Sequence, residues 1–361
     1  MSKRMKHSNK AVEQLEDGVT VIEEKKENLA KASVKGDFIY QHVTDRMLQL
    51  LDEGVVPWKQ PWKQQQNVVT GQEYRGINQM MLGYSGRKSP YWLTYRQMDE
   101  MGGHLKEGDD RSTMVTFWKF FDHRDKSESA GAADVGSTGE QRSRPPLLLY
   151  YRVFNLDQIE FDADVVLPTG VRARIENHHN VQNDVQATGG GRALLESMSQ
   201  RCANKPRFVM EDANRAYYSL TDDCINMPPP GAFVNAARYY GVLFHELGHW
   251  TGPRLGRKQE GYRPHNHGEI YSQEELVAEM TSAFACSKAG IFCENEAQNA
   301  AYISTWKNVL ATDNKCVIRA AGQAQRAFDY LMGVNFDAGQ NSSLVVASSE
   351  ETSGNQMAVG S

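Results

Sequence analysis

FHELGHWTG, residues 244–252, is the stretch that decides how this chain folds and what it can bind. In an α-helix, residues four apart lie on one face, so His245 and His249 can bind one metal ion while Glu246 holds a water beside it. The residues before the motif keep apolar or small side chains at helical spacing, without a proline after Pro230. The motif therefore predicts a long helix that carries a metal site of the zinc hydrolase type.

A zinc hydrolase usually has a third protein ligand, which leaves the fourth position to water. A second predicted helix ends at Gly290, and it offers Glu275 and Glu279 on one face, whereas Glu274 is expected to point elsewhere. We assign Glu275 as the ligand and Glu279 as the carboxylate that accepts the remaining N–H of a metal-binding histidine. The reverse assignment of these two glutamates stays open. The donors favour zinc, although manganese or another divalent ion would suit them.

The segment between these helices, residues 251–273, is rich in glycine, proline, arginine and histidine, as expected for a loop over a cleft. His265 and His267 are alternative ligands or proton donors, although such histidines are more often solvated. Before the motif, residues 216–220 and 224–227 have the pattern of short strands around a turn. A strand beside the metal helix can pair with an extended peptide by its edge, or it can simply complete a small sheet.

Composition indicates a soluble, cytoplasmic protein. Hydrophobic residues make up 40% of the 361 residues and the formal net charge is −5, which allows two domains with real cores and identifies no partner by charge. The five cysteines are odd in number and lack CxxC spacing, so we expect neither a disulfide framework nor a cysteine zinc site. No apolar stretch follows the basic N-terminus and no long uncharged run occurs, so we expect no export signal and no membrane partner.

Changes in composition divide the chain into segments. We expect a disordered or frayed charged arm at residues 1–36, a first domain at 37–165 with a flexible insertion at 125–146, a second domain at 166–336, and a polar tail at 337–361. The first domain begins with an amphipathic helix that ends at Gly54 and has a strong strand signal after the insertion. The predicted fold class is α+β, with a mixed α/β first domain and a mainly helical second domain that holds a small sheet.

Aromatic residues in the first domain alternate with lysine and arginine. This pattern suits single-stranded nucleic acid, because bases stack on the rings, each worth about 1–3 kcal/mol, while the cations follow the phosphates. The alternative is that most of these rings are core, and the nearly balanced charges of the domain indicate no large basic surface. The candidate residues are Trp58, Lys59, Trp62, Lys63, Tyr74, Arg75, Trp92 and Arg96.

The chain as a whole resembles the ArdC-type antirestriction proteins of plasmids and phages. The resemblance is carried by YQHVTDRMLQLLDEGVVPWKQPW, YRGINQMML and SPYWLTYRQMDEMGGHLKEG, and then by RAYYSLTDDCINMPPPGAF, YYGVLFHELGHWTG, EELVAEMTSAFACSKAGI and AAYISTWKNVL. It implies a single-stranded DNA-binding domain, a zincin-like metallopeptidase domain, and protection of incoming mobile DNA from host restriction. By motif, it also implies metal ligands at His245, His249 and a glutamate of EELVAE, with Glu246 as the catalytic position. The charged arm and the insertion have no counterpart in the family pattern.

Three functions of different class are compatible with these features. In a DNA-associated metallopeptidase, zinc would activate a water and Glu246 would carry its proton to the leaving amine. In a non-catalytic single-stranded DNA-binding protein, the metal would be structural and the DNA would be protected by coating. In a DNA–protein crosslink protease, single-stranded DNA would stimulate cleavage of bound proteins. We expect an antirestriction role, with a restriction enzyme or another DNA-bound protein as the candidate substrate.

Overall fold

The computed structural model describes residues 36–59, 62–120, 146–162, 164–180, 187–257, 273–291 and 300–334. The predicted arm, insertion and tail lie outside these residues, apart from residues 36 and 146, and so do His265 and His267. The chain divides into two compact units, one formed by residues 1–42 and 117–149 and the other by residues 43–116 and 150–361. The described part of the first unit is the beginning of a helix, the end of β4 and the beginning of β5.

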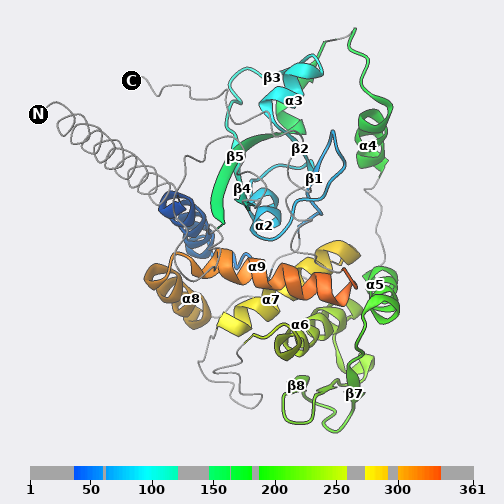
Figure 1. Ribbon diagram of the computed structural model, residues 1–361. Coiled ribbons are helices and arrows are strands. Elements are labelled where there is room, and N and C mark those ends of the chain that lie inside the picture. The colour runs from blue at the N-terminus through cyan, green and yellow to red at the C-terminus, as the bar shows by residue number, and fades with distance from the viewer. Residues whose placement is uncertain are drawn as a thin grey trace, which may run out of the picture. The chain divides into compact units, whose positions relative to one another are not determined.

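A four-stranded sheet with the order β1-β2-β5-β4 organises the N-terminal half (Figure 1). Its strands are β1 (Gln66–Asn67), β2 (Tyr91–Leu93), β4 (Thr113–Lys119) and β5 (Leu147–Asn155). β1 is parallel to β2, and β2 is antiparallel to β5 with Trp92 opposite Asn155. The smaller elements of this half are α2 (Ile77–Gly83), α3 (Tyr95–Glu100), β3 (Gly103–Leu105) and β6 (Ile159–Phe161), of which β3 and β6 form an antiparallel pair.

The first described helix confirms the predicted amphipathic pattern. It covers residues up to 52, and its apolar stripe is buried, including Val43, Met47 and Leu51. It ends at Gly54, which has a φ of 77° and donates its N–H to the carbonyl of Leu51. Glycine suits this position because a side chain disfavours such a backbone conformation.

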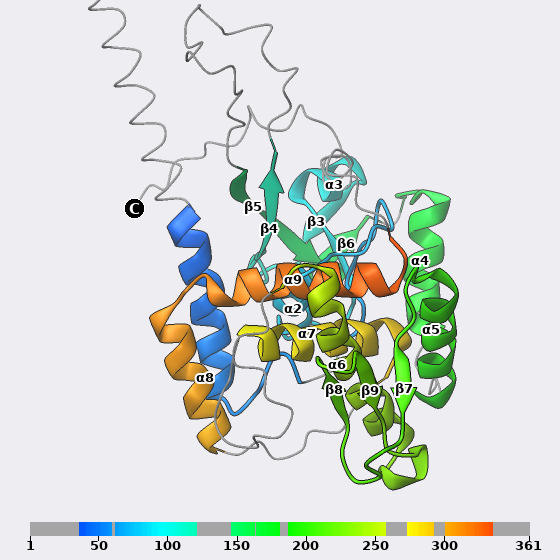
Figure 2. The same cartoon turned by 60° about the horizontal axis from the view of Figure 1, so that its bottom comes forward.

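The C-terminal half is mainly helical. Its helices are α4 (Thr169–Asn180), α5 (Ala187–Arg201), α6 (Ala236–Arg254), α7 (Gln273–Ala289), α8 (Ala300–Thr312) and α9 (Cys316–Leu331). A three-stranded sheet with the order β7-β9-β8 lies beside α6 (Figure 2), with β7 (Arg207–Val209), β8 (Tyr217–Ser219) and β9 (Cys224–Asn226). β8 is therefore an edge strand next to the helix that carries the histidine motif.

The helices α6 and α7 pack closely because small residues lie where they cross. A Cβ atom at Gly248 would lie 3.0 Å from the Cα of Ala278 and 3.3 Å from its carbonyl oxygen. The hydroxyl of Ser282 donates to the carbonyl of Gly241 over 2.7 Å, which ties the helices together one turn further along α7 and two turns earlier on α6. This close approach brings the histidines of α6 to the glutamates of α7.

The predicted α+β class is confirmed, with mixed sheets and helices in the N-terminal half and a small sheet among the helices of the C-terminal half. The predicted strand after the insertion corresponds to β5, and the two strands before the histidine motif correspond to β8 and β9. No helix within the described ranges is long and apolar enough to cross a membrane.

Candidate metal centre

Three side chains from α6 and α7 converge on one point, and we call them the metal centre: His245, His249 and Glu275. The Nε2 atoms of the two histidines are 3.1 Å apart. Glu275 Oε1 lies 3.3 Å from His245 Nε2, and Glu275 Oε2 lies 3.5 Å from His249 Nε2. Both rings therefore face the same carboxylate, as the spacing of four residues along one helix allows.

These distances suit a divalent metal ion. Zinc bonds of about 2.0–2.2 Å to nitrogen and oxygen at tetrahedral angles separate neighbouring ligand atoms by about 3.3–3.5 Å. The three separations in the metal centre, 3.1, 3.3 and 3.5 Å, are close to that value. The donor set of two imidazoles and one carboxylate also suits manganese and related ions. The residues present thus fit a bound divalent ion.

The electrostatics of the metal centre favour a positive charge. Burial would lower the pKa of His245, but Glu275, with smaller contributions from Glu246 and Glu279, raises it to about 10. Burial would also lower the pKa of His249, but the effect of Glu274 and Glu275 is larger, so the pKa of His249 is raised as well. The pKa of the Glu275 carboxyl lies well below its ordinary value because the nearby histidines outweigh the effect of burial. A metal cation can supply the positive charge that these groups otherwise take from protons.

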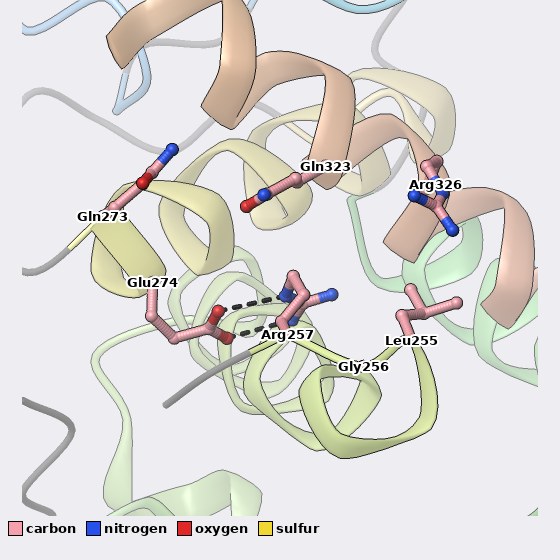
Figure 3. Close-up of a pocket in the computed structure, with 7 residues that line it drawn as sticks. All are labelled: Leu255, Gly256, Arg257, Gln273, Glu274, Gln323 and Arg326. Carbon is pink, nitrogen blue, oxygen red and sulfur yellow. Dashed lines mark hydrogen bonds and ion pairs between the residues drawn. The ribbon is translucent and has the colours of Figure 1, made fainter. Parts of the chain in front are cut away.

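Glu274 supports His249 from behind, which corrects the expectation that Glu274 points elsewhere. Its Oε1 lies 3.5 Å from His249 Nδ1, the ring nitrogen that faces away from Glu275. Arg257 donates to both oxygens of Glu274 over 2.9 and 3.0 Å, as the two dashed lines in Figure 3 show, and it also donates to the carbonyl of Gly248. Such a carboxylate partner fixes the orientation of a metal-binding imidazole.

At His249 the position predicted for Glu279 is taken by Glu274, whose carboxylate lies 3.5 Å from Nδ1. Glu279 Oε1 instead lies 3.2 Å from the Nζ of Lys59 and 3.5 Å from the hydroxyl of Tyr302.

Glu274, Arg257 and five neighbours also line a cavity of about 390 Å³. Figure 3 shows Gln323 and Arg326 of α9 on the opposite side of that cavity from Glu274.

Glu246 is buried beside the metal centre and next to the edge strand β8. Burial raises the pKa of its carboxyl, whereas His245, His249 and a hydrogen bond from the backbone N–H of Tyr218 lower it, and the net shift is upward. The carboxylate of Glu246 is therefore held between the two histidines and the strand.

An anchor that the sequence did not reveal fixes β8 against α6. Asp223, in the turn after β8, accepts a hydrogen bond from the hydroxyl of Tyr218 over 2.9 Å and from Arg254 over 2.6 Å. Arg254 lies at the end of α6, with its guanidinium 3.8 Å from the centroid of the Trp250 ring. The turn of the sheet and the end of the motif helix are thus tied together.

The four aromatic residues predicted to stack on nucleic acid are core residues, which corrects that expectation. Trp58, Trp62, Tyr74 and Trp92 are all less than a tenth exposed, and we call them the aromatic set. Trp92 donates its indole N–H to Gln65 over 2.6 Å, and Trp58 packs edge-on against Trp306 of α8. A buried ring has no open face for a base, so the alternative that these rings form the core is the correct one.

The predicted basic residues are placed in different environments. Lys59 approaches Glu279, Arg75 forms an ion pair with the buried Asp329, and Arg96 pairs with Glu100 over 2.7 Å on an exposed surface. Lys63 is exposed. These four residues therefore differ in exposure and in their acidic partners.

Exposed aromatic rings in the N-terminal half were not among the predicted DNA-binding residues, although Tyr95 lies in the aromatic stretch PYWLTYRQ, because the sequence does not show which rings of such a stretch are exposed. Tyr95 is 58% exposed and packs edge-on against Phe154, with ring centroids 6.3 Å apart. Tyr150 is 38% exposed, and Arg152, two residues further along β5, is also exposed. Because side chains two apart in a strand share a face, Tyr150, Arg152 and Phe154 lie along one side of β5.

Comparisons with known proteins agree with this site. Residues 37–154 match the N-terminal domain of anti-restriction factor ArdC, and residues 197–323 match the zincin-like metallopeptidase family. Two proteins named DNA primase TraC from Escherichia coli are 28% and 27% identical over 305 and 314 residues, which are 81% and 83% of this chain. The chain spans only 20% and 27% of their lengths. The uncharacterized protein y4eC from Sinorhizobium fredii is 28% identical, over 84% of this chain and 94% of its own.

Two crystal structures of the antirestriction ArdC protein from plasmid R388 are also similar. The metal-free structure is 32% identical with a TM-score of 0.57, and the match covers 84% of this chain and 97% of that one. The Mn(II)-bound structure is 31% identical with the same TM-score, and the match covers 82% and 98%. This chain therefore belongs to the ArdC family of antirestriction proteins, with an ArdC N-terminal domain followed by a zincin-like metallopeptidase domain.

Proposed function

We propose that this protein is a zinc-dependent metallopeptidase that binds single-stranded DNA and protects incoming mobile DNA from restriction. The observation that carries the peptidase proposal is the convergence of His245, His249 and Glu275, with Glu246 buried beside them. A related structure of this family is described as Mn(II)-bound, so manganese is the alternative ion. A restriction enzyme or another DNA-bound protein is the proposed substrate.

The openness of the metal centre favours catalysis over a purely structural metal. Structural zinc sites usually close with four protein ligands, whereas catalytic sites keep one position for water. Among the described residues, three donors converge, and the exposed fraction of their side chains rises from 2% for His249 to 19% for His245 and 31% for Glu275. Substrate would therefore approach from the side of His245 and Glu275.

The residues of this chain divide the work of peptide hydrolysis. A bound divalent ion supplies Lewis acidity, which makes a water proton easier to remove and a carbonyl carbon easier to attack. Glu246 is the general base that accepts this proton and delivers it to the nitrogen of the leaving amine. Glu274 keeps the ring of His249 in place, and Arg257 keeps Glu274 in place.

The edge strand β8 is the proposed site for an extended peptide. β8 pairs with β9 along one of its edges. The backbone N–H of Tyr218, a residue of β8, donates to the carboxylate of Glu246. An added strand gains main-chain hydrogen bonds, and this would align its carbonyl groups beside the metal centre. The Asp223–Arg254 pair supports this arrangement because it holds the strand against α6.

For single-stranded DNA, we propose the exposed side of β5 and the start of α3 in place of the aromatic set. Tyr150 and Tyr95 offer accessible ring faces, while Arg152 and Arg96 supply positive charge. Aromatic rings stack with any base, and cations follow the phosphates. Replacing Tyr95 and Tyr150 together by serine is expected to weaken binding of a fluorescent oligothymidylate by about 30-fold or more, since two stacked bases are together worth at least about 2 kcal/mol. Replacing Tyr217, on β8 of the other half, by serine is the control.

The central test compares wild type with Glu246→Gln, which keeps the shape of the side chain and removes the base. We expect unchanged zinc and oligothymidylate binding and a fall of about 10²–10⁴-fold in cleavage of unfolded casein, the usual contribution of a general base. Glu196→Gln, on the exposed surface of α5, is the matched control. The same variants are then compared for protection of transferred DNA in cells that carry a restriction system. Full protection by Glu246→Gln would show that antirestriction does not need the peptidase.

A further inference from the structure

Two residues of the N-terminal half, Trp58 and Lys59, contact the helices α7 and α8. The indole N–H of Trp58 donates to the hydroxyl oxygen of Tyr302, on α8, over 3.1 Å. The ammonium group of Lys59 lies 4.2 Å from the centroid of the Tyr302 ring and 3.2 Å from Glu279 Oε1. The Tyr302 hydroxyl and Glu279 Oε1 are 3.5 Å apart. We call these four residues the tyrosine cluster.

The tyrosine cluster lies one helical turn from the metal centre along α7. Glu279 follows Glu275 by one helical turn on α7, and residues at that spacing have Cβ atoms roughly 5–6 Å apart on the same face. The charge of Glu279 raises the pKa of His245, and the charge of Glu275 raises the pKa of Tyr302. The hydroxyl of Tyr302 therefore lies beside a carboxylate that is one helical turn from the ligand Glu275.

The contacts of Tyr302 prepare its hydroxyl to donate a hydrogen bond. Burial, with a smaller effect of Glu279, raises the pKa of Tyr302, so the phenol keeps its hydrogen at neutral pH. The indole of Trp58 occupies the oxygen as a donor, which directs the O–H hydrogen elsewhere and polarises it. The O–H to Glu279 separation of 3.5 Å is long for a hydrogen bond, so a nearer oxygen would compete well for this hydrogen.

We propose that Tyr302 donates a hydrogen bond to the carbonyl oxygen of the scissile peptide as negative charge develops there, and that Trp58 and Lys59 position it. The proposal rests on the peptidase function proposed above. As the water oxygen bonds to the carbonyl carbon, the π electron pair moves to the carbonyl oxygen, and Glu246 holds the proton of the water. When the C–N bond breaks, that proton goes to the nitrogen. Tyr302 keeps its own proton throughout.

This assignment makes the N-terminal half part of the peptidase site. Trp58 and Lys59 precede β1 in the N-terminal half, whereas Tyr302 and Glu279 belong to helices of the C-terminal half. The aromatic set therefore includes one member, Trp58, whose buried N–H reaches the catalytic region. A purely structural role of Tyr302 would use its ring, which contacts Trp306, and its hydroxyl oxygen as the acceptor of the Trp58 N–H, so loss of the hydroxyl would lower stability and leave the kcat of the folded protein unchanged.

The test uses Tyr302→Phe in the full chain loaded with zinc, because this change keeps the ring and removes only the hydroxyl. We expect kcat on unfolded casein to fall about 100-fold, as is usual when one donor to a developing oxyanion is removed. The value of KM and the zinc affinity should stay close to wild type, whereas the thermal midpoint should fall modestly because the buried Trp58 N–H loses its acceptor. The matched control is Tyr330→Phe. Tyr330 lies at the C-terminal end of α9, and its hydroxyl accepts a hydrogen bond from Asn204. Trp58→Phe should lower kcat in the same direction, by a smaller factor.

A second measurement does not depend on turnover. A phosphinic dipeptide carries two oxygens on a tetrahedral phosphorus and so imitates the reacting carbonyl. Its affinity for zinc-loaded protein should fall in Tyr302→Phe by about the factor by which kcat falls, whereas affinity for an ordinary peptide of the same sequence should not change. If wild type is active, and Tyr302→Phe has the same kcat and the same phosphinate affinity as wild type, the role of Tyr302 is overturned. Inactive wild type overturns the peptidase function, and phosphinate affinity then decides whether Tyr302 is nevertheless a donor to a bound oxyanion.

Discussion

The metal centre and the aromatic set are both held by partners on other elements, but the metal centre is partly exposed at His245 and Glu275, whereas the aromatic set is buried. In the metal centre, two imidazoles and a carboxylate face one another, and Glu275 remains partly exposed to solvent. In the aromatic set, the rings are packed against apolar neighbours, and Trp92 and Trp58 direct their N–H groups to Gln65 and Tyr302. The metal centre therefore concentrates charged groups at a point that solvent can reach, whereas the aromatic set packs the hydrophobic core.

This difference separates chemistry from stability. Polar donors that share one small volume repel or attract each other strongly, so their arrangement is maintained only with supporting partners such as Glu274 and Arg257. Aromatic rings lose contact with water and stabilise the fold by their area. Mutations in the two regions should therefore have different consequences, and the predictions below separate ligand binding from stability.

The largest effect is expected from removing a ligand of the metal centre. His249→Ala should lower zinc affinity by more than the roughly 10–100-fold that loss of an outer partner causes, because a donor bond itself is lost. Competition with a chromophoric chelator measures this affinity. His104→Ala, an exposed histidine on β3, is the control and should bind zinc as wild type does. Retention of wild-type affinity by His249→Ala would place the metal elsewhere.

Mutations in the aromatic set should lower the free energy of unfolding. Trp92 is fully buried, so Trp92→Ala should cost about 3–5 kcal/mol of unfolding free energy. Urea denaturation measures the loss. Tyr95→Ala, at an exposed position two residues after β2, should stay within about 0.5 kcal/mol of wild type. A Trp92→Ala protein with normal stability but weakened oligothymidylate binding would contradict the placement of this ring in the core.

The success of the sequence analysis differed between the two regions for a physical reason. The spacing of His245 and His249 is set by the helix itself, so a correct helix prediction already places both rings on one face. The aromatic segments carry no comparable constraint. A tryptophan beside a lysine suits a nucleic-acid surface and a domain core equally well, and only the packing of Trp92 between neighbouring strands decides the matter.

The position of Glu274 could not be predicted from helical periodicity alone. The spacing of Glu275 and Glu279 correctly groups them on one face of α7, but it does not say which residue reaches the far side of His249. That depends on how α6 and α7 cross at Gly248, and on Arg257, which follows α6 without any recognisable motif. Contacts between elements distant in sequence are decided by this crossing, and one chain without its relatives does not reveal it.

Glu274→Gln therefore tests the support of the metal centre, with a smaller expected effect than loss of a ligand. Zinc affinity should fall about 10–100-fold, since the orientation and basicity of His249 depend on the carboxylate. Glu279→Gln is the matched control from the same helix, and its zinc affinity should change less. Titration with zinc at fixed chelator concentration compares the two. A larger loss in Glu279→Gln would restore the original assignment of that residue.

The smallest effect concerns the anchor that holds β8 against α6. A hydrogen bond from Arg254 holds the pKa of the Asp223 carboxyl below its ordinary value. A depressed folded-state pKa stabilises the fold at pH values above the unfolded pKa, near 3.9, and this stability is lost as the pH falls through the lower folded value. Because the Asp223 side chain is 53% exposed, we expect no more than about 1 kcal/mol.

Asp223→Asn isolates this contribution, because asparagine tolerates the positive φ of 49° at this position and carries no charge. The difference in unfolding free energy between wild type and variant should be present at pH 6 and should shrink below pH 4, as urea denaturation at each pH would show. Asp164→Asn, at an exposed loop position, should give a smaller difference at pH 6. A difference for Asp223→Asn that does not change with pH would assign the anchor to the shape of the turn, and its charge would then contribute nothing to the position of β8.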